Sequence, residues 1–211
     1  MRPLTPAVGG SRKRAFDVVA ATALLIFFAP LMIIIYIVLR GTSRGSPIFP
    51  HWRVGFDGDE FECLKFRTMV DSADGMLEAL LNSDPELLAE WRQGQKLKND
   101  PRVTPFGRFL REFSLDELPQ LINVIRGDMS LVGPRPVIRA ELTRYGEQGS
   151  ANYMRARPGI TGLWQTTARG SSDYDQRVKL DTSYVRDWTF GGDIEILWRT
   201  IRVVLSRDGS W

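Results

Sequence analysis

Residues 113–136 read Phe-Ser-Leu-Asp-Glu-Leu-Pro-Gln-Leu-Ile-Asn-Val-Ile-Arg-Gly-Asp-Met-Ser-Leu-Val-Gly-Pro-Arg-Pro, and the rest of the chain is organised around this stretch. Ser114 and Glu117 have the spacing of a capping box, which predicts that a helix begins at Ser114. Gly127 is a candidate C-cap for that helix. Between these two ends, one apolar stripe at helical spacing is formed by Leu118, Leu121, Ile122 and Ile125.

Asp116 falls in the first turn of this predicted helix. Exposed backbone N–H groups and the positive end of the helix dipole favour an ionised carboxylate there, and would favour a phosphate beside it. Acidic residues are also common in first turns for purely local reasons, so the pattern alone indicates structure more often than function. The surroundings favour function, because the flanking segments are rich in arginine: Arg108, Arg111, Arg126 and Arg135.

Three motifs in order resemble those of a known family. They are residues 110–136, residues 65–69 (Lys-Phe-Arg-Thr-Met) and residues 157–165 (Arg-Pro-Gly-Ile-Thr-Gly-Leu-Trp-Gln). The chain resembles the bacterial sugar transferases, also called monotopic polyprenyl-phosphate phosphoglycosyl transferases, over about residues 12 to 206. Three motifs in the family's order are a specific signal.

The resemblance implies transfer of a hexose 1-phosphate from a UDP-sugar to undecaprenyl phosphate, with release of UMP, at the start of exopolysaccharide or other surface glycan synthesis. Overall likeness favours galactose 1-phosphate. Asp116 is the expected nucleophile, through a covalent aspartyl-phosphosugar intermediate. Glu117 is the expected ligand of Mg²⁺, which proteins hold with one or two carboxylates plus substrate phosphates. The expected phosphate-binding cations are Lys65, Arg67, Arg111, Arg135 and Arg157.

Composition narrows the chemistry. The 211 residues include one cysteine, Cys63, and one histidine, His51, which excludes an internal disulfide and histidine-cluster metal chemistry. His51 lies in an apolar-aromatic run and is interpreted as structural. Catalysis would then rest on carboxylates, lysines and arginines. The net charge of +3 is too mild for a nucleic-acid-binding tail but suits anionic lipid and anionic substrates.

An uncharged run predicts a membrane segment. Residues 18–39 would form a helix of roughly 33 Å, long enough to cross a bilayer core. Pro30 lies in the middle, and arginines flank both ends, so both ends prefer the cytoplasm. A Pro-kinked transmembrane helix and a re-entrant helix broken at Ala29-Pro30 fit the residues equally. The resemblance implies the re-entrant form, on the cytoplasmic face of the bacterial inner membrane.

The predicted fold is mixed α/β and dominated by helices. Residues 1–11 are expected to be disordered, 12–40 to form the membrane helix and 41–211 the catalytic domain. Ile48–Val54 and Phe61–Phe66 predict a β-hairpin, in which Lys65 and Arg67 would share one face. That face could equally be a plain solvated one. Predicted helices cover 72–97 with a break at Asp84-Pro85, 105–112, 137–145, 173–188 and 193–206.

Three further expectations concern the second half of the chain. Met129–Val132 predicts a short strand, so the fold should contain one small sheet. Residues 153–165 predict a loop whose glycines either permit close approach of a ligand or make a tight turn. The apolar stripe of helix 193–206 fits a membrane interface or the protein's own core equally well. This much apolar surface is also compatible with a homodimer.

Two other functions compete with the transferase. A membrane-bound UDP-sugar hydrolase would use water in place of the lipid phosphate, so UMP release would not depend on lipid. A noncatalytic scaffold that binds anionic lipid through its arginines would release no UMP. Nucleic-acid binding does not fit the mild charge and the apolar segment.

Overall fold

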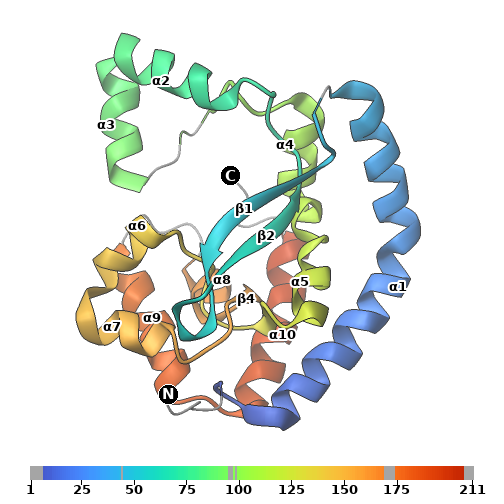
Figure 1. The fold of residues 1–211 in the computed structure, drawn as a ribbon, viewed down its shortest axis with the longest axis vertical. Helices are drawn as coiled ribbons and strands as arrows, with labels where there is room; N and C mark the ends of the chain where they lie inside the picture. Colours follow the sequence, from blue (N-terminus) through green and yellow to red (C-terminus); the bar gives the residue numbers. More distant parts are fainter. Residues whose placement is uncertain (1–6, 44, 95–96, 98, 169–173, 207–211) are drawn as a thin grey trace.

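A computed structural model describes residues 7–43, 45–94, 97, 99–168 and 174–206. Helices surround two small two-stranded sheets (Figure 1), which confirms the predicted helix-dominated α/β fold but divides the single expected sheet into two. Residues 1–6 of the segment predicted to be disordered lie outside the described residues, as does Asp173 at the predicted start of a later helix.

Helix α1 (Gly10–Thr42) is one continuous helix of 33 residues that runs as a bow along one flank (Figure 1). The residues fitted a Pro-kinked helix and a helix broken at Ala29-Pro30 equally, and the family resemblance implied the break; in the structure the helix continues through Pro30. A proline inside a helix removes one backbone hydrogen bond and bends the axis. The hydrogen bonds on either side hold the segment helical, so the predicted break is absent from the described structure.

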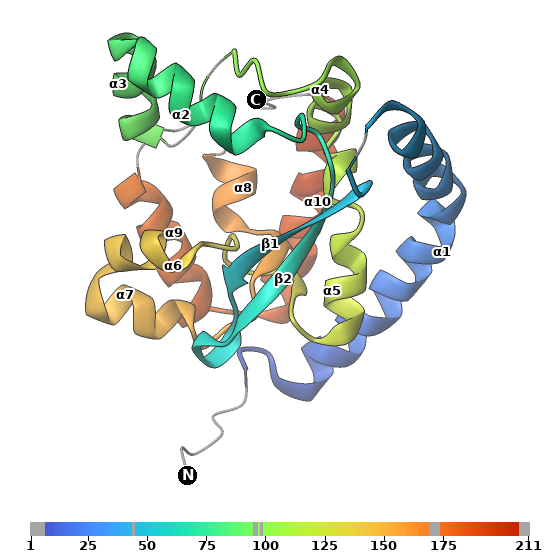
Figure 2. The same cartoon turned by 45° about the horizontal axis from the view of Figure 1, so that its top comes forward.

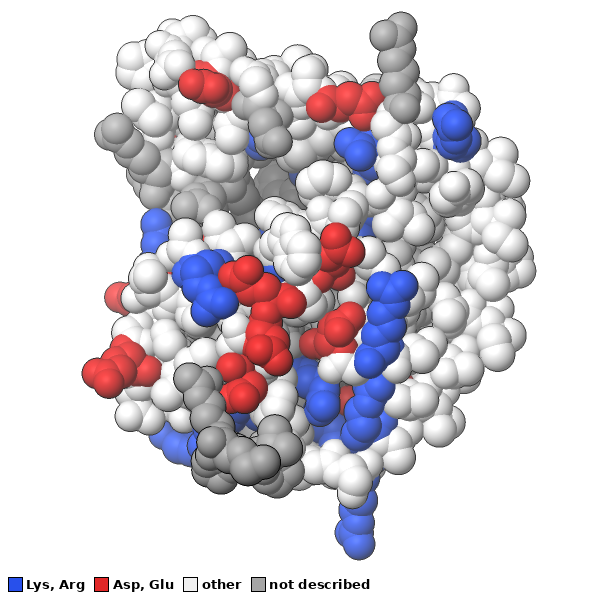
Figure 3. All heavy atoms as spheres, in the orientation of Figure 1, with Lys and Arg blue, Asp and Glu red and all other residues white. Residues whose placement is uncertain are grey.

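The outward side of α1 is apolar and uncovered. Val19, Ile26, Phe27 and Ile37 each expose 63% or more of their surface. The flank formed by α1 carries almost no charged side chains on the face shown in Figure 3. By length and composition α1 could cross a membrane, with a mean hydropathy of 2.8 in its most apolar window.

A buried polar network holds the first turns of α1 against the protein body. Lys13 Nζ donates to Asp193 Oδ2 at 2.6 Å. Asp193 also accepts hydrogen bonds from Tyr184 Oη and Trp188 Nε1. One turn further along α1, Asp17 accepts a hydrogen bond from the Ser130 hydroxyl at 2.8 Å. Buried charges in proteins need such partners.

The stretch predicted to open a helix at Ser114 is built differently. Helix α4 (Pro105–Glu112) is followed by the 3₁₀ turn η2 (Leu115–Glu117) and then by α5 (Gln120–Arg126). Ser114 has φ 55° and makes no side-chain cap, so the predicted capping box is wrong. Its left-handed backbone instead separates α4 from η2. Gly127, with φ 103°, ends α5 as predicted.

The predicted hairpin is confirmed. Strands β1 (Ile48–Val54) and β2 (Glu60–Phe66) pair antiparallel, joined through the short 3₁₀ turn η1 (Phe56–Gly58). Asn123 of α5 fastens the outer edge of β2: its amide nitrogen donates to Glu62 O at 2.8 Å, and its amide oxygen accepts from Leu64 N at 2.9 Å. The hairpin is therefore fixed in register against α5, while β1 forms its other edge.

Strands β3 (Ser130–Val132) and β4 (Gly159–Thr161) form the second sheet, and they are parallel. The sequence predicted a strand for the first and a loop for the second. A Cβ atom on Gly159 would lie 2.1 Å from the backbone nitrogen of Gly133. Glycine here admits another backbone, not a ligand, and this is why a Pro- and Gly-rich segment can form a strand.

Helices α2 (Ala73–Ser83) and α3 (Pro85–Gly94) form an arm that stands out from the body in both ribbon views (Figures 1 and 2). Asp84 lies between them, and its carboxylate accepts from Glu86 N at 2.8 Å, as expected for the start of a helix. Arg102 lies over the ring of Trp91 and connects the arm to the body.

The rest of the chain is helical. Its elements are α6 (Arg139–Leu142), the 3₁₀ turn η3 (Thr143–Tyr145), α7 (Gly146–Tyr153), α8 (Leu163–Thr167), α9 (Tyr174–Arg186) and α10 (Phe190–Ser206). The predicted helix 137–145 is thus a short α-helix followed by a 3₁₀ turn. On α10, Ile196 is buried in the core, whereas Ile194, Trp198 and Ile201 expose 43% to 59% of their surface. The predicted stripe is only partly used for packing.

The contact between the two motifs can be tested at Gly159. Gly159→Ala would drive a methyl group into the backbone of Gly133, so we expect a loss of unfolding free energy of about 2 kcal/mol or more. Denaturant unfolding followed by tryptophan fluorescence measures the loss. Gly75→Ala is the control, since no atom lies within 4 Å of its added Cβ and alanine favours a helix. Equal stability of both variants would contradict the packing.

The network at the start of α1 can be tested at Asp193. Asp193→Ala leaves the buried Lys13 ammonium without its 2.6 Å partner, so we expect a loss of about 3 to 5 kcal/mol. The matched control is Glu195→Gln, which breaks the exposed Arg199–Glu195 pair and should change stability by less than about 1 kcal/mol. Thermal and denaturant unfolding of both variants provide the comparison.

Candidate active site

The carboxylates of η2 meet a cation from the hairpin. Asp116 is only 8% exposed, although it is charged and lies in a surface turn. Lys65, near the end of β2, donates from Nζ to Glu117 Oε1 at 2.7 Å. The left-handed backbone of Ser114 turns η2 toward β2, so two acidic residues and one lysine come together from segments about fifty residues apart.

Arg111 completes this group from α4. Its Nε donates to Thr68 Oγ1 at 2.9 Å, which orients the guanidinium. Burial raises the pKa of the Asp116 carboxyl above its ordinary value, and the neighbouring Glu117 carboxylate raises it too, while the charges of Lys65 and Arg111 act to lower it. A buried carboxylate held among cations is suited to attack an electrophilic phosphorus, because the cations favour its ionised form and would also attract the phosphate.

A second cationic group lies further along the same hairpin. Arg53 of β1 donates from Nη2 to His51 Nδ1 at 3.2 Å, and its Nη1 lies 3.7 Å from Glu141 Oε2. Burial lowers the pKa of Arg53, and the nearby charge of Arg135 lowers it further. Arg53 and Arg135 are therefore two like charges within mutual influence.

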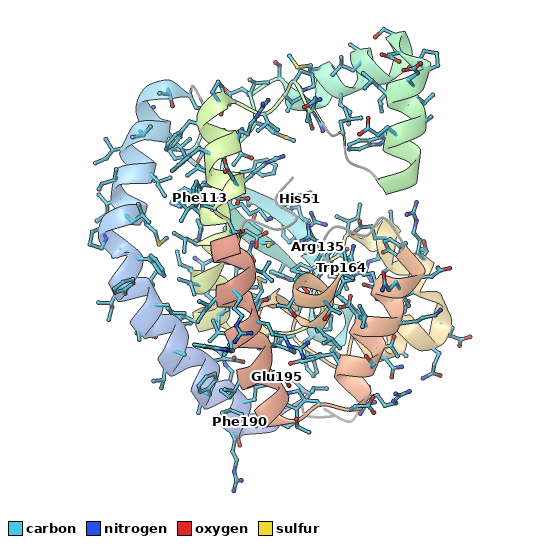
Figure 4. The ribbon with its side chains drawn as sticks, turned by 180° about the vertical axis from the view of Figure 1, so that it is seen from behind. His51, Phe113, Arg135, Trp164, Phe190 and Glu195 are labelled. Carbon is cyan, nitrogen blue, oxygen red and sulfur yellow. The ribbon has the colours of Figure 1, made fainter. Side chains whose placement is uncertain are left out.

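Arg135 belongs to the turn that follows β3 and contacts an indole ring. Its guanidinium carbon lies 5.7 Å from the ring centroid of Trp164 in α8, and that of Arg177 in α9 lies 5.2 Å from the same ring. Figure 4 shows Arg135 and Trp164 close together, with His51 on the neighbouring hairpin. Among the described residues, several buried polar atoms around Arg135 have no hydrogen-bond partner: Trp164 Nε1, Gln165 Oε1 and Arg177 Nε and Nη2, although Arg177 Nε lies 3.8 Å from Asp181 Oδ2.

Two predicted phosphate-binding residues lie elsewhere. Arg67 follows the end of β2, where its Nε donates to Ser46 O at 2.7 Å and its Nη1 lies 3.3 Å from Asp71 Oδ1. Arg157 donates to Gly127 O at 2.8 Å, so it lies at the C-terminal end of α5, while Asp116 precedes the N-terminal end. The structure thus brings together Asp116, Glu117, Lys65 and Arg111, with Arg135 in the second group.

Sequence reasoning missed Arg53 and interpreted His51 as structural. The signal was available, because both residues alternate along a predicted strand that pairs with the strand of Lys65. Thr68 was also missed, and no local pattern marks it as the partner of Arg111. Trp164 and Arg177 become neighbours of Arg135 only through the packing of α8 and α9.

A divalent cation would find two adjacent carboxylates here. Among the described residues, no group of three or more histidine, cysteine or acidic side chains could hold a metal ion. Mg²⁺ needs no such group, because it commonly uses one or two carboxylates together with substrate phosphates and water. Asp116 and Glu117 are two such carboxylates. Lys65 Nζ already lies 2.7 Å from one oxygen of Glu117.

The chain is similar to characterised proteins along nearly its whole length. Residues 9–207 match the family described as bacterial sugar transferase. The exopolysaccharide production protein ExoY of Rhizobium meliloti is 47% identical over 204 residues, which cover 97% of this chain and 90% of that protein. The undecaprenyl-phosphate galactose phosphotransferase of Salmonella typhimurium is 52% identical over 200 residues, 94% of this chain.

A third relative, the UDP-galactose-lipid carrier transferase of Erwinia amylovora, is 52% identical over 201 residues. This chain spans only 41% of the length of the Salmonella and Erwinia relatives. The match to the family nevertheless includes every segment that builds the two cationic groups. The chain therefore belongs to the bacterial sugar transferase family.

Proposed function

We propose that the protein transfers galactose 1-phosphate from UDP-galactose to undecaprenyl phosphate, releases UMP, and so begins the assembly of an exopolysaccharide. The names of the relatives support the acceptor, the sugar and the pathway: one is a galactose phosphotransferase acting on undecaprenyl phosphate, and another is an exopolysaccharide production protein. Family membership supports the type of reaction.

The single observation that carries the chemistry is the burial of Asp116 beside Lys65, Glu117 and Arg111. In the proposed first step, an Asp116 oxygen attacks the phosphorus that bears the sugar. The bond between that phosphorus and the bridging oxygen breaks, and UMP leaves with the electron pair. The product on the enzyme is a mixed anhydride of Asp116 and the sugar phosphate.

In the second step, a phosphate oxygen of the lipid attacks the same phosphorus. The bond to Asp116 breaks, the carboxylate is restored, and the sugar is left on a lipid diphosphate. Lys65 and Arg111 stabilise the charge on the phosphoryl oxygens in both steps. Arg67, Arg135 and Arg157 remain proposed phosphate-binding residues, with Arg135 best supported by its position near the hairpin.

Glu117 is the proposed carboxylate ligand of Mg²⁺. The ion would supply neutralisation of the diphosphate when it is bound. Lys65 holds Glu117 in place and shields the two carboxylates from each other. The protein contributes the two carboxylates, which both lie on the short turn η2.

We propose that α1, as one continuous helix, inserts its exposed apolar side into the cytoplasmic leaflet of the bacterial inner membrane. Its exposed apolar face, and the basic residues before and after it, support this arrangement. The exposed stripe on α10, with Trp198 and nearby arginines, suits the interface between lipid and water. The membrane association of such lipid-carrier transferases fits the long apolar helix.

UMP release by the detergent-solubilised protein tests the function directly. The assay uses Mg²⁺ and a panel of UDP-sugars, with and without undecaprenyl phosphate. We expect sustained release only with the lipid and with UDP-galactose. Lipid-independent release would indicate a hydrolase, and no release with any sugar would indicate a noncatalytic scaffold. Preference for another sugar would correct the substrate and leave the reaction intact.

The nucleophile is tested by Asp116→Asn. An amide cannot form the anhydride, so we expect turnover to fall by at least about 1000-fold. UDP-galactose binding should stay largely intact. Intact-mass spectrometry without lipid should detect a hexose-phosphate adduct on the unsubstituted protein and none on the variant. Asp59→Asn, at an exposed turn, is the control. An adduct that persists in Asp116→Asn would exclude this residue as the nucleophile.

The metal ligand is tested by Glu117→Gln. An amide oxygen is a weaker ligand for Mg²⁺, so the concentration needed for half-maximal rate should rise at least about tenfold, or activity should be lost. Titration of Mg²⁺ against initial UMP release provides the measurement. Glu62→Gln, an exposed carboxylate on the strand of Lys65, should leave the titration unchanged. An unaltered Mg²⁺ requirement in Glu117→Gln would rule out this role.

A further inference from the structure

One face of the hairpin carries a cation from each of the two groups, Lys65 from the group around Asp116 and Arg53 from the second group. The register pairs Phe49 with Lys65 and His51 with Cys63. Directly opposed residues of an antiparallel pair point to the same face, and residues two apart along a strand do so as well. His51 and Arg53 therefore share a face with Lys65, the residue that holds Glu117.

His51 fixes the position of the Arg53 guanidinium. An arginine can only donate hydrogen bonds, so at 3.2 Å His51 Nδ1 must accept. The imidazole is then neutral and carries its proton on Nε2. His51 lies two residues along the strand from the level of Lys65, which is about 7 Å. That separation is comparable to the length of a diphosphate.

The positive charge of Arg53 is only loosely compensated within the described residues. Its ion pair with Glu141 measures 3.7 Å, against 2.7 Å between Lys65 and Glu117. Its other charged neighbour, Arg135, repels it. Two guanidinium groups within each other's electrostatic influence favour a bound anion between them.

Cys63 connects this region to the nucleophile. Its buried thiol lies within electrostatic influence of Lys65 and Glu117 on one side and of Arg53 and Arg135 on the other. An anion between Arg53 and Arg135 would thus be next to a phosphate held by Lys65. Figure 4 shows His51 and Arg135 around the same part of the hairpin.

We propose that Arg53, together with Arg135, binds the nucleoside-bearing phosphate of the donor, and that His51 is a positioning residue for Arg53. This inference rests on the proposed function. In an in-line displacement the leaving oxygen lies opposite the attacking carboxylate. As the Asp116–phosphorus bond forms and the bond to the bridging oxygen breaks, one negative charge develops on UMP. Arg53 lies where that charge appears, and no proton transfer is required.

Binding to catalytically inactive protein tests the site without turnover. In an Asp116→Asn background, UMP and uridine are titrated by calorimetry, with and without Arg53→Gln. A charge-assisted contact to phosphate predicts about 10- to 100-fold weaker UMP binding and unchanged uridine binding. Arg53→Lys, which keeps the charge, should recover part of the affinity. Arg139→Gln is the control, because Arg139 pairs with exposed Glu60 at the distal end of the hairpin.

Each outcome separates the possibilities. Unchanged UMP affinity in Arg53→Gln overturns the assignment, and so does an equal loss of UMP and uridine affinity, which would mean a structural role. Failure of the Asp116→Asn parent protein to bind UMP would overturn the proposed function along with it. If the unsubstituted protein transfers galactose while Arg53→Gln in the inactive background keeps normal UMP affinity, the proposed function stands and this inference is refuted.

The role of His51 has its own test. His51→Leu removes the acceptor of the Arg53 hydrogen bond, so UMP binding should weaken by several-fold, again with uridine unaffected. His51→Gln keeps an acceptor oxygen and should restore most of the affinity. Equal UMP affinity in the two variants would contradict a positioning role.

Discussion

The active site depends on one buried carboxylate, Asp116, that lies among competing charges. Burial of Asp116 opposes its negative charge, and Lys65 and Arg111 counteract that effect from two other elements. Lys65 reaches Asp116 only because the hairpin lies against η2. Arg111 reaches it because α4 ends just before that turn. The register of β2 against α5, fixed by Asn123, is therefore part of the electrostatics of the site.

Helix α5 is held in place at its C-terminal end, opposite the end that Asp116 and Glu117 precede. Its C-terminal carbonyl groups are clamped by Arg14, which donates to Val124 O at 2.5 Å and Ile125 O at 2.9 Å, and by Arg157. Cations at the C-terminal end of a helix satisfy its last carbonyl groups and complement its dipole. The short helix is thus anchored at the end away from the reaction, which leaves the other end available for Asp116 and Glu117. Arg157 has a structural partner here whatever its relation to substrate.

Local patterns predicted the elements that depend on local rules. The hairpin, the break at Asp84-Pro85, the helix over 105–112 and the Gly127 terminus were all readable from sequence. The capping box at Ser114 failed because Ser114 adopts a left-handed backbone and α5 begins only after Pro119. The strand at Gly159 could not be predicted, since its partner is 29 residues away and the pairing depends on backbone contact with Gly133. Of the site, the Asp116 group was predicted, whereas Arg53 required the register of the hairpin.

Helix α1 is fastened to the body at both ends: by the Lys13 and Asp17 network near its start, and by Ile35 and Leu39, which pack with Phe66 and Leu110 near its end. Because α1 is held near both ends, it cannot swing away from the body about one of them. The position of Asp116 relative to the apolar side of α1 is then fixed by the fold. An acceptor anchored in lipid must therefore bring its head group to the level of Asp116 by its own movement within the membrane.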